Sequence, residues 1–357
     1  MSTSISPTTE SRGSKVRRLG RVILERYMVY IAFVALLLVF AVLLFDDGFL
    51  DGRNLLSIAR VTATISIMAI AAVFVLSVGE IDLSIGSVVA LSAVVSAMTL
   101  PNYGIVVAAL AGIGSGLAVG FVNGIIITKL KVPSFLVTLG MMQIVSGLSR
   151  TISNLQVIPI TDRVYLDVFG QGKIGPVESI FVWTLLVLVI GHLVYRKTPF
   201  GRHVLATGGN RLAATYSGIK TDRVRIGAMM IGSLGASIAG LLQAGRLGGA
   251  RYDFGSNDLL IVLAAVVIGG TSMFGGKGSV IGAVIGSLLI GSLTNGLILM
   301  NTSVSNQMIA QGAIIVLAVC LSSREALAGV DARRRPRWLR RRSSEATSGE
   351  KPGEAAS

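Results

Sequence analysis

The sequence predicts an all-α fold, a bundle of membrane-spanning helices with about ten spans. Apolar residues make up 52% of the 357 positions, charged residues only 14%, and the mean hydropathy is +0.74. A water-soluble domain could not cover its surface with so few charges. The uncharged run 27–45 has roughly the 20 residues that a span requires. Lipid is therefore the expected solvent for most of this chain.

Ten uncharged runs rich in Gly, Ala, Val, Ile and Leu are expected as spans, because helices packed in lipid use small residues at their contacts. They are 27–45, 58–78, 85–99, 104–128, 133–150, 177–195, 226–246, 259–271, 280–300 and 307–321. The third, eighth and tenth runs are short and interrupted or bounded by glycines, which predicts re-entrant or buried segments. No cleavage pattern follows Phe45, so the first run is expected as an uncleaved span.

The basic residues predict which side of the membrane each loop faces. With the N terminus inside, 25 of the 32 Lys and Arg residues lie on the cytosolic side. The seven on the outer side are Arg53, Arg60, Arg150, Arg163, Lys173, Arg246 and Arg251. This bias predicts a multi-pass inner-membrane protein with both termini cytosolic. It also argues against a nucleic-acid partner, which a net charge of +14 would suggest for a soluble protein.

The expected organisation has three parts. Residues 1–26 form a basic cytosolic tail, 27–321 the membrane domain, and 322–357 a second basic tail whose Ser- and Glu-rich end is expected to be disordered. The Arg-rich run 333–342 either binds anionic membrane lipids or only fixes the topology.

A weak internal repeat is visible inside the membrane domain. Asn123-Gly124 and Asn295-Gly296 each precede three Ile or Leu residues. In the ten-span arrangement the first pair lies at the cytosolic end of its helix and the second at the outer end. A five-plus-five inverted repeat would produce this placement, and chance similarity in a biased composition is the alternative.

Catalytic and metal sites are not expected. The chain has two histidines, His192 and His203, one cysteine, Cys320, and few acidic residues. The nearest phosphate-loop candidate has Thr271 and Gly278 where a nucleotide-binding loop needs Gly and Ser or Thr. No cofactor is therefore expected on this chain, and any ATP that drives it is hydrolysed by a separate subunit.

The stretch 79–92 places Glu80 and Asp82 between apolar runs. Carboxylates are costly near lipid, so they are expected to be buried in protein, capped by backbone amides or lining a polar cavity. Asp82 and Ser84 are also candidate caps for a helix that begins near Ile85. All three polar residues are candidates for a helix break or for a solute path.

The segment 198–219 is expected to be a docking surface for a partner. Pro199 begins it, the Gly208-Gly209-Asn210 turn divides it into short amphipathic helices, and Gly218 ends it. A merely solvated loop would not carry the apolar residues Phe200, Val204, Leu205, Leu212 and Ile219.

Four stretches, 79–92, 123–142, 198–219 and 268–297, resemble in order the ribose-type family of ABC permeases. The resemblance implies two permease copies, as a homodimer or a related heterodimer, two cytosolic ATPase domains and a periplasmic-type solute-binding protein. It also implies that 198–219 couples to the ATPase through Phe200, Gly201, Arg202, Gly209, Asn210, Ala213, Ala214 and Gly218. The chain departs from the family at Glu80, where many relatives carry Gly, and at Arg211, where an acidic residue is common.

The expected function is that of an importer permease for a monosaccharide, ribose- or xylose-like, or a similar small polar solute, working by alternating access. Solute affinity would lie mainly in the binding protein. The alternatives are a permease for branched-chain amino acids or nucleosides, a secondary transporter, and a scaffolding protein. Candidates for the solute path, which helix packing also explains, are Ser66, Asn123, Thr138, Gln143 and Asn295.

Overall fold

A computed structural model describes residues 29–314 and 316 of this chain. These residues are mostly helical, with two small antiparallel ribbons. One pairs β1 (Ile158–Pro159) with β4 (Gly249–Ala250), and the other pairs β2 (Lys173–Ile174) with β3 (Val177–Glu178). The predicted all-α class is confirmed for this part of the chain. The predicted tails, Cys320 and the Arg-rich run lie outside it, so the three-part division stays a prediction.

Within the described residues, six helices are long and apolar enough to cross a membrane. Helices Val29–Leu43 and α10 (Asp258–Ile268) are apolar but shorter, and residues 304–314 are also helical. The remaining elements are α5 (Arg163–Leu166), the π-helix η1 (Asp167–Gln171), α7 (Pro199–Gly209) and α8 (Arg211–Tyr216). The six long helices are α2 (Gly52–Ser77), α3 (Ile85–Lys129), α4 (Ser134–Ser153), α6 (Ser179–Lys197), α9 (Thr221–Leu247) and α11 (Val280–Leu299).

Helix α3 consists of two antiparallel halves. Gly104, at a φ of 75°, interrupts the helical backbone. A Cβ built on Gly112 would lie 2.8 Å from the carbonyl oxygen of Ser92, and one on Gly116 would lie 2.9 Å from Val88. Residue numbers therefore rise along one half as they fall along the other. A straight helix of this length would extend about 67 Å, twice the hydrocarbon core. The expected runs 85–99 and 104–128 correspond to these halves.

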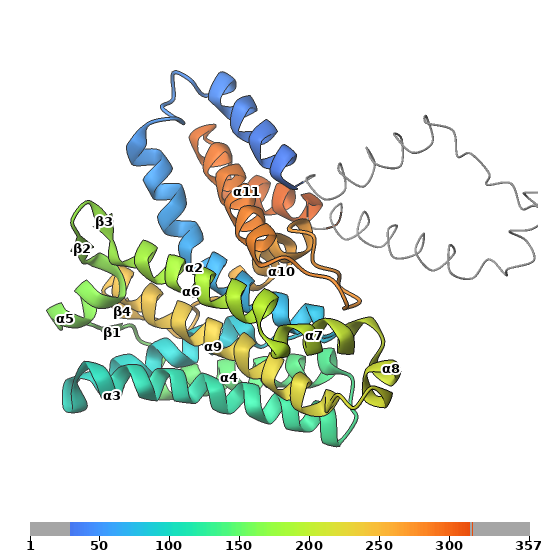
Figure 1. Cartoon of the computed structure of the whole chain (residues 1–357). Helices are drawn as coiled ribbons and strands as arrows, with labels where there is room; N and C mark the ends of the chain where they lie inside the picture. Colours follow the sequence, from blue (N-terminus) through green and yellow to red (C-terminus); the bar gives the residue numbers. More distant parts are fainter. Residues whose placement is uncertain (1–28, 315, 317–357) are drawn as a thin grey trace, which may run out of the picture.

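Helices α2 and α9 and the first half of α3 form the centre of the bundle, and the second half of α3 lies along its edge (Figure 1). The second half of α3 approaches α9 through four glycines spaced one turn apart, which let the backbones come close. Two of the facing side chains of α9 are serines, Ser233 and Ser237, and Ser92 of the first half of α3 donates a hydrogen bond of 2.9 Å to Ser237. Helices α10 and α11 pack against α2. The four glycines are Gly112, Gly116, Gly120 and Gly124.

The bundle has two distinct ends. Helices α7 and α8 lie at one end, and α5 and the two ribbons lie at the opposite end (Figure 1). Near the start of α2, Asn54 and Asn295 exchange hydrogen bonds of 3.0 and 2.9 Å, whereas Asn123 bonds to the turn that follows the end of α2. The two Asn-Gly pairs thus lie toward opposite ends, as the sequence predicts.

Candidate functional site

The segment 198–219 folds into the two short helices that its sequence predicts. Thr198 accepts a hydrogen bond from the backbone in the first turn of α7, and Pro199 occupies the first helical position. Asn210, at a φ of −160°, accepts a 3.0 Å bond from the Ala213 amide and caps α8. The prediction of a Gly-Gly-Asn turn is wrong in one respect, since both glycines belong to α7. Asn210 alone, with its extended backbone, separates the two helices.

Helix α8 presents an apolar surface at its end of the molecule. Leu212 is 72% exposed and Tyr216 is 89% exposed. They lie four residues apart, on one face of the helix. Sequence reasoning missed Tyr216, although its spacing from Leu212 was a usable signal. The predicted coupling residues that are exposed beside this surface are Arg202, Gly209, Asn210, Ala213 and Gly218.

Three predicted coupling residues face the bundle instead. Gly201 and Ala214 are buried, and Phe200 is partly buried with its ring centroid 6.3 Å from that of Phe74. A Cβ on Gly201 would lie 2.0 Å from the carbonyl oxygen of Tyr195. These three residues hold the segment against the membrane helices. Only the exposed coupling residues are therefore available for direct contact with a partner.

A turn between α2 and α3 lies directly against α7. Helix α2 ends in a Schellman motif, in which the amides of Gly79 and Glu80 each donate 3.0 Å bonds to the carbonyls of Leu76 and Val75. Gly79 has a φ of 86°, which favours glycine. The predicted helix break at 79–84 is therefore present as a capped turn.

Helix α4 bonds to three further backbone groups of this turn. The amide of Ile81 donates to the hydroxyl of Ser134, and the amide of Leu83 donates to that of Thr138, each over 3.1 Å. Thr138 in turn donates to the carbonyl of Ile81 over 3.2 Å. Ser134 was not singled out from the sequence, since a serine after Pro133 is also typical of an ordinary helix start.

Asp82 is buried at the start of α3. Its Oδ1 accepts hydrogen bonds from the amide and the hydroxyl of Ser84, over 2.8 and 2.5 Å, and Asn123 donates to the Ser84 hydroxyl over 3.0 Å. Ser84 holds the N-cap position, but its hydroxyl donates to Asp82 and accepts no amide of α3. The predicted capping by Ser84 is thus wrong, because its hydroxyl is oriented toward the Asp82 carboxylate and accepts from the Asn123 side chain in place of a backbone amide.

One oxygen of this carboxylate has no partner. Neither Asp82 Oδ2 nor Asn123 Oδ1 forms a hydrogen bond within the described part of the chain, and both are buried. Burial raises the pKa of Asp82 to about 6, against the opposing effect of the bonds from Ser84. The folded protein therefore binds this proton more tightly than the unfolded chain does, and it loses stability as pH rises from about 4 to about 6.

Asp82→Asn is expected to stabilise the protein at pH 7.5, by on the order of 2 kcal/mol, because asparagine keeps the Oδ1 acceptor and removes the buried charge. At pH 4.5, where the carboxyl is protonated in the folded state, the difference should largely vanish. Thermal unfolding of the detergent-purified protein at both pH values measures it. Asp82→Ala is the control, and it should be less stable than Asp82→Asn at both pH values, since Ser84 loses its acceptor. Equal melting temperatures of wild type and Asp82→Asn at pH 7.5 would contradict this interpretation.

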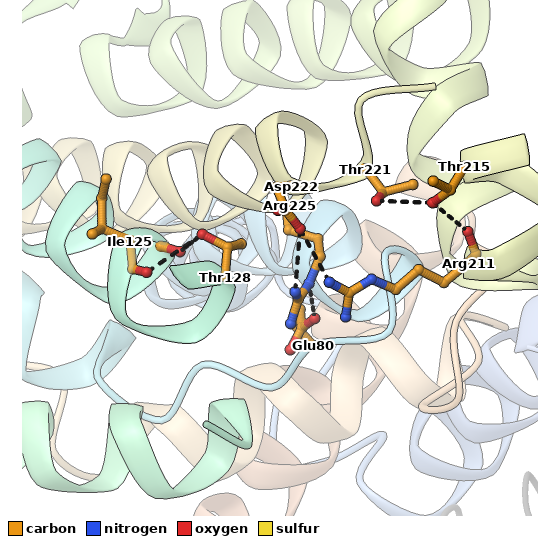
Figure 2. A network of polar contacts seen from close by, with 9 residues as sticks. Glu80, Ile125, Thr128, Arg211, Thr215, Thr221, Asp222 and Arg225 are labelled. Atoms are coloured by element: carbon orange, nitrogen blue, oxygen red, sulfur yellow. Dashed lines mark hydrogen bonds and ion pairs between the residues drawn. The ribbon is translucent and has the colours of Figure 1, made fainter. Parts of the chain in front are cut away.

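Glu80 belongs to a chain of ion pairs that reaches α8 (Figure 2). Arg225 Nε, on α9, donates to the Glu80 carboxylate over 2.5 Å, with only 7% and 10% of the two side chains exposed. Asp222, one turn before Arg225, bonds to Arg211 on α8 over 3.1 Å. The expectation that Glu80 is buried in protein is confirmed.

In a comparison with known protein families, residues 54–319 of this chain match one family. This range matches the family described as "Branched-chain amino acid transport system / permease component". The chain belongs to this permease family. The ribose import permease protein of Bacillus subtilis (strain 168) is 36% identical over 81% of this chain and 90% of its own length. The L-arabinose ABC transporter permease protein of Azospirillum brasilense is 33% identical over 88% and 93%. No solved structure matches the chain.

Most of the candidate path residues of this permease bond to neighbouring helices. Ser66 and Ser287 share a 2.6 Å hydrogen bond between α2 and α11, and Asn295 pairs with Asn54. Thr138 and Asn123 bond to the α2–α3 turn. Gln143 is exposed on α4. Helix packing accounts for the four bonded residues, so a role in the solute path stays a prediction. The described residues contain no acidic, His or Cys cluster suited to a metal ion.

Proposed function

We propose that this permease is the membrane-spanning subunit of an ABC importer for a monosaccharide such as ribose or xylose, or a similar small polar solute. The observation that carries the proposal is the apolar surface of α8, placed beside a turn that α4 and α9 hold in position. An exposed Leu and Tyr next to capped, rigid backbone suit a groove on a protein partner. Relatives named for ribose and L-arabinose support the sugar class.

The proposed assembly contains a cytosolic ATPase subunit at the α7–α8 end, which binds and hydrolyses ATP. A periplasmic-type solute-binding protein would contact the opposite end, and a second permease copy, identical or related, would complete the pathway between the subunits. Both termini would then be cytosolic in the inner membrane, as the basic residues indicate. Membrane lipids would surround the bundle.

Ten crossings arranged as an inverted repeat are part of the proposal. The two halves of α3, the other five long helices, two shorter apolar helices and the segment that begins at residue 304 supply ten candidates. The placement of the Asn-Gly pairs toward opposite ends supports the repeat.

Branched-chain amino acids are the second candidate solute class, because the description of the matched family names them. Nucleosides are a third class of small polar solute, and a secondary transporter would move its solute without an ATPase. Uptake of labelled ribose, xylose, leucine and uridine into membrane vesicles separates the three solute classes. Repeating the assay without ATP, and again with the ion gradient collapsed, separates an ABC importer from a secondary transporter.

Leu212→Glu is expected to reduce co-purification of the ATPase with the permease by about tenfold or more, because it buries a charge in the centre of the docking contact. The matched control is Ile174→Glu, which changes a residue of similar exposure, 68%, at the other end of the bundle. Full ATPase binding by Leu212→Glu, with ATP-driven uptake retained, would refute the docking role of α8.

A further inference from the structure

The ion pairs between α8 and the α2–α3 turn are arranged so that one carboxylate has two possible partners. Asp222 Oδ1 lies 3.1 Å from Arg211 and 3.9 Å from Arg225. The first distance is a hydrogen bond and the second is not. A shift of Asp222 of about 1 Å would exchange these partners.

Arg225 has one hydrogen-bond donor, NH1, that is unused within the described part of the chain and lies near Asp222. Its Nε is bound to Glu80, but its NH1 is buried and forms no hydrogen bond with any residue that the structure describes. A buried guanidinium with an unused donor is costly, so it favours any movement that supplies an acceptor. Asp222 is the acceptor in reach.

The two arginines have different surroundings. Arg211 is about half exposed, at 48%, on the surface of α8, whereas Arg225 is buried against Glu80. A partner that docks on α8 would meet Arg211 first. An acidic group on that partner would compete with Asp222 for Arg211, and it would leave Asp222 to bond with Arg225.

A movement of the Arg225 side chain would displace residues at the start of α3. Glu80 is the last residue of the Schellman motif, and it stands two residues before Asp82, which holds Ser84 and, through it, Asn123. The backbone of the turn is held in place, because its amides at Ile81 and Leu83 donate hydrogen bonds to side chains of α4. A displacement of the Glu80 carboxylate would therefore move backbone that joins α2 to α3.

We propose that Asp222 is a switching carboxylate, which pairs with Arg211 while α8 is free and with Arg225 when the ATPase is docked, and so transmits docking to the α2–α3 turn. This inference rests on the proposed function. Asp222 and Arg225 are positioning residues in it, since they act on the helix break and touch no solute. Glu80 and Arg225 are 145 positions apart in the sequence, so the relay links elements that the chain itself does not join directly.

The test uses the whole importer in membrane vesicles, with three readouts: ATPase bound to the permease, ATP hydrolysed, and solute imported per ATP. Asp222→Asn is expected to leave binding intact and to lower solute per ATP about fivefold or more, the usual lower range of coupling between sites. Asp222→Glu, which keeps the charge, should restore most of this ratio. Glu178→Gln is the matched control, because it removes the Arg60 ion pair at the opposite end of the bundle and should leave the ratio unchanged.

A double-mutant cycle tests whether Asp222 acts through Glu80. In the relay, Glu80→Gln and Asp222→Asn interrupt the same connection, so the double variant should be no worse than the more impaired single variant. Independent effects, or an unchanged ratio in Asp222→Asn, would overturn the proposal. If Glu80→Gln does not assemble, the comparison of Asp222→Asn with Asp222→Glu decides alone. If wild-type uptake did not require the ATPase, the proposed function itself would be contradicted.

Discussion

Gly120→Ile is expected to prevent normal packing of the membrane bundle. A Cβ at Gly120 would lie 2.6 Å from the Ser233 hydroxyl and 2.8 Å from the carbonyl oxygen of Met229, so α3 and α9 must separate to admit any side chain. Overpacking on this scale costs about 3 kcal/mol or more. The melting temperature in detergent should fall by roughly 6–12 °C, or the protein should fail to accumulate in the membrane.

Gly114→Ile provides the control for this substitution. Gly114 lies on the same helix, it is exposed, and no atom lies within 4 Å of a Cβ built on it. Its substitution should change the melting temperature little. Comparable losses at Gly114 and Gly120 would indicate that isoleucine harms α3 through its helix propensity, and that the close approach to α9 is unimportant.

The sequence predicts the local features of this fold well because they depend on neighbouring residues. Length and hydropathy indicate the helices, Pro199 and Asn210 indicate α7 and α8, and Gly79 indicates the end of α2. Each of these signals acts within one or two turns. The fold-back of α3 is indicated only by the separation of the expected runs 85–99 and 104–128, and Gly104, with its positive φ, lies at their boundary.

Pairings between distant segments could not be predicted in the same way. The sequence indicates that Glu80 must be buried or paired, but Arg225 is one of many basic residues, and only packing of α2 and α9 brings it to Glu80. Ser134 and Thr138 likewise look like helix-surface hydroxyls until the α2–α3 turn is placed beside them. The path candidates have the same limit, since polarity in an apolar run also serves helix packing.

The sequence also could not predict which residues of the segment 198–219 are exposed. Family resemblance selects Gly201, Ala214 and Gly209 together, yet the first two are buried and the third is on the surface. A glycine can serve the fold or the partner, and only the distances to its neighbours distinguish these roles.

Gly208→Ala and Gly209→Ala are therefore expected to differ sharply, although the two residues are adjacent in α7. A Cβ at Gly208 would lie 1.9 Å from the carbonyl oxygen of Ser77 and 2.7 Å from the amide of Gly276, which itself donates a 2.9 Å bond to that carbonyl. A Cβ at Gly209 would meet only the Cα of Gly276, at an ordinary 3.9 Å. Alanine at 208 must push α7 away from the end of α2, whereas alanine at 209 fits.

The measured consequence is in transport. ATP-driven uptake by Gly208→Ala should fall about tenfold or more, within the range expected when coupling between two sites is lost, because α7 no longer contacts the end of α2 that leads into the α2–α3 turn. Gly209→Ala should keep most of its uptake, and both variants should still bind the ATPase, since α8 is unchanged. Normal uptake by Gly208→Ala would mean that the contact between α7 and α2 carries no part of the coupling, which would then have to run through α8 and α9 alone.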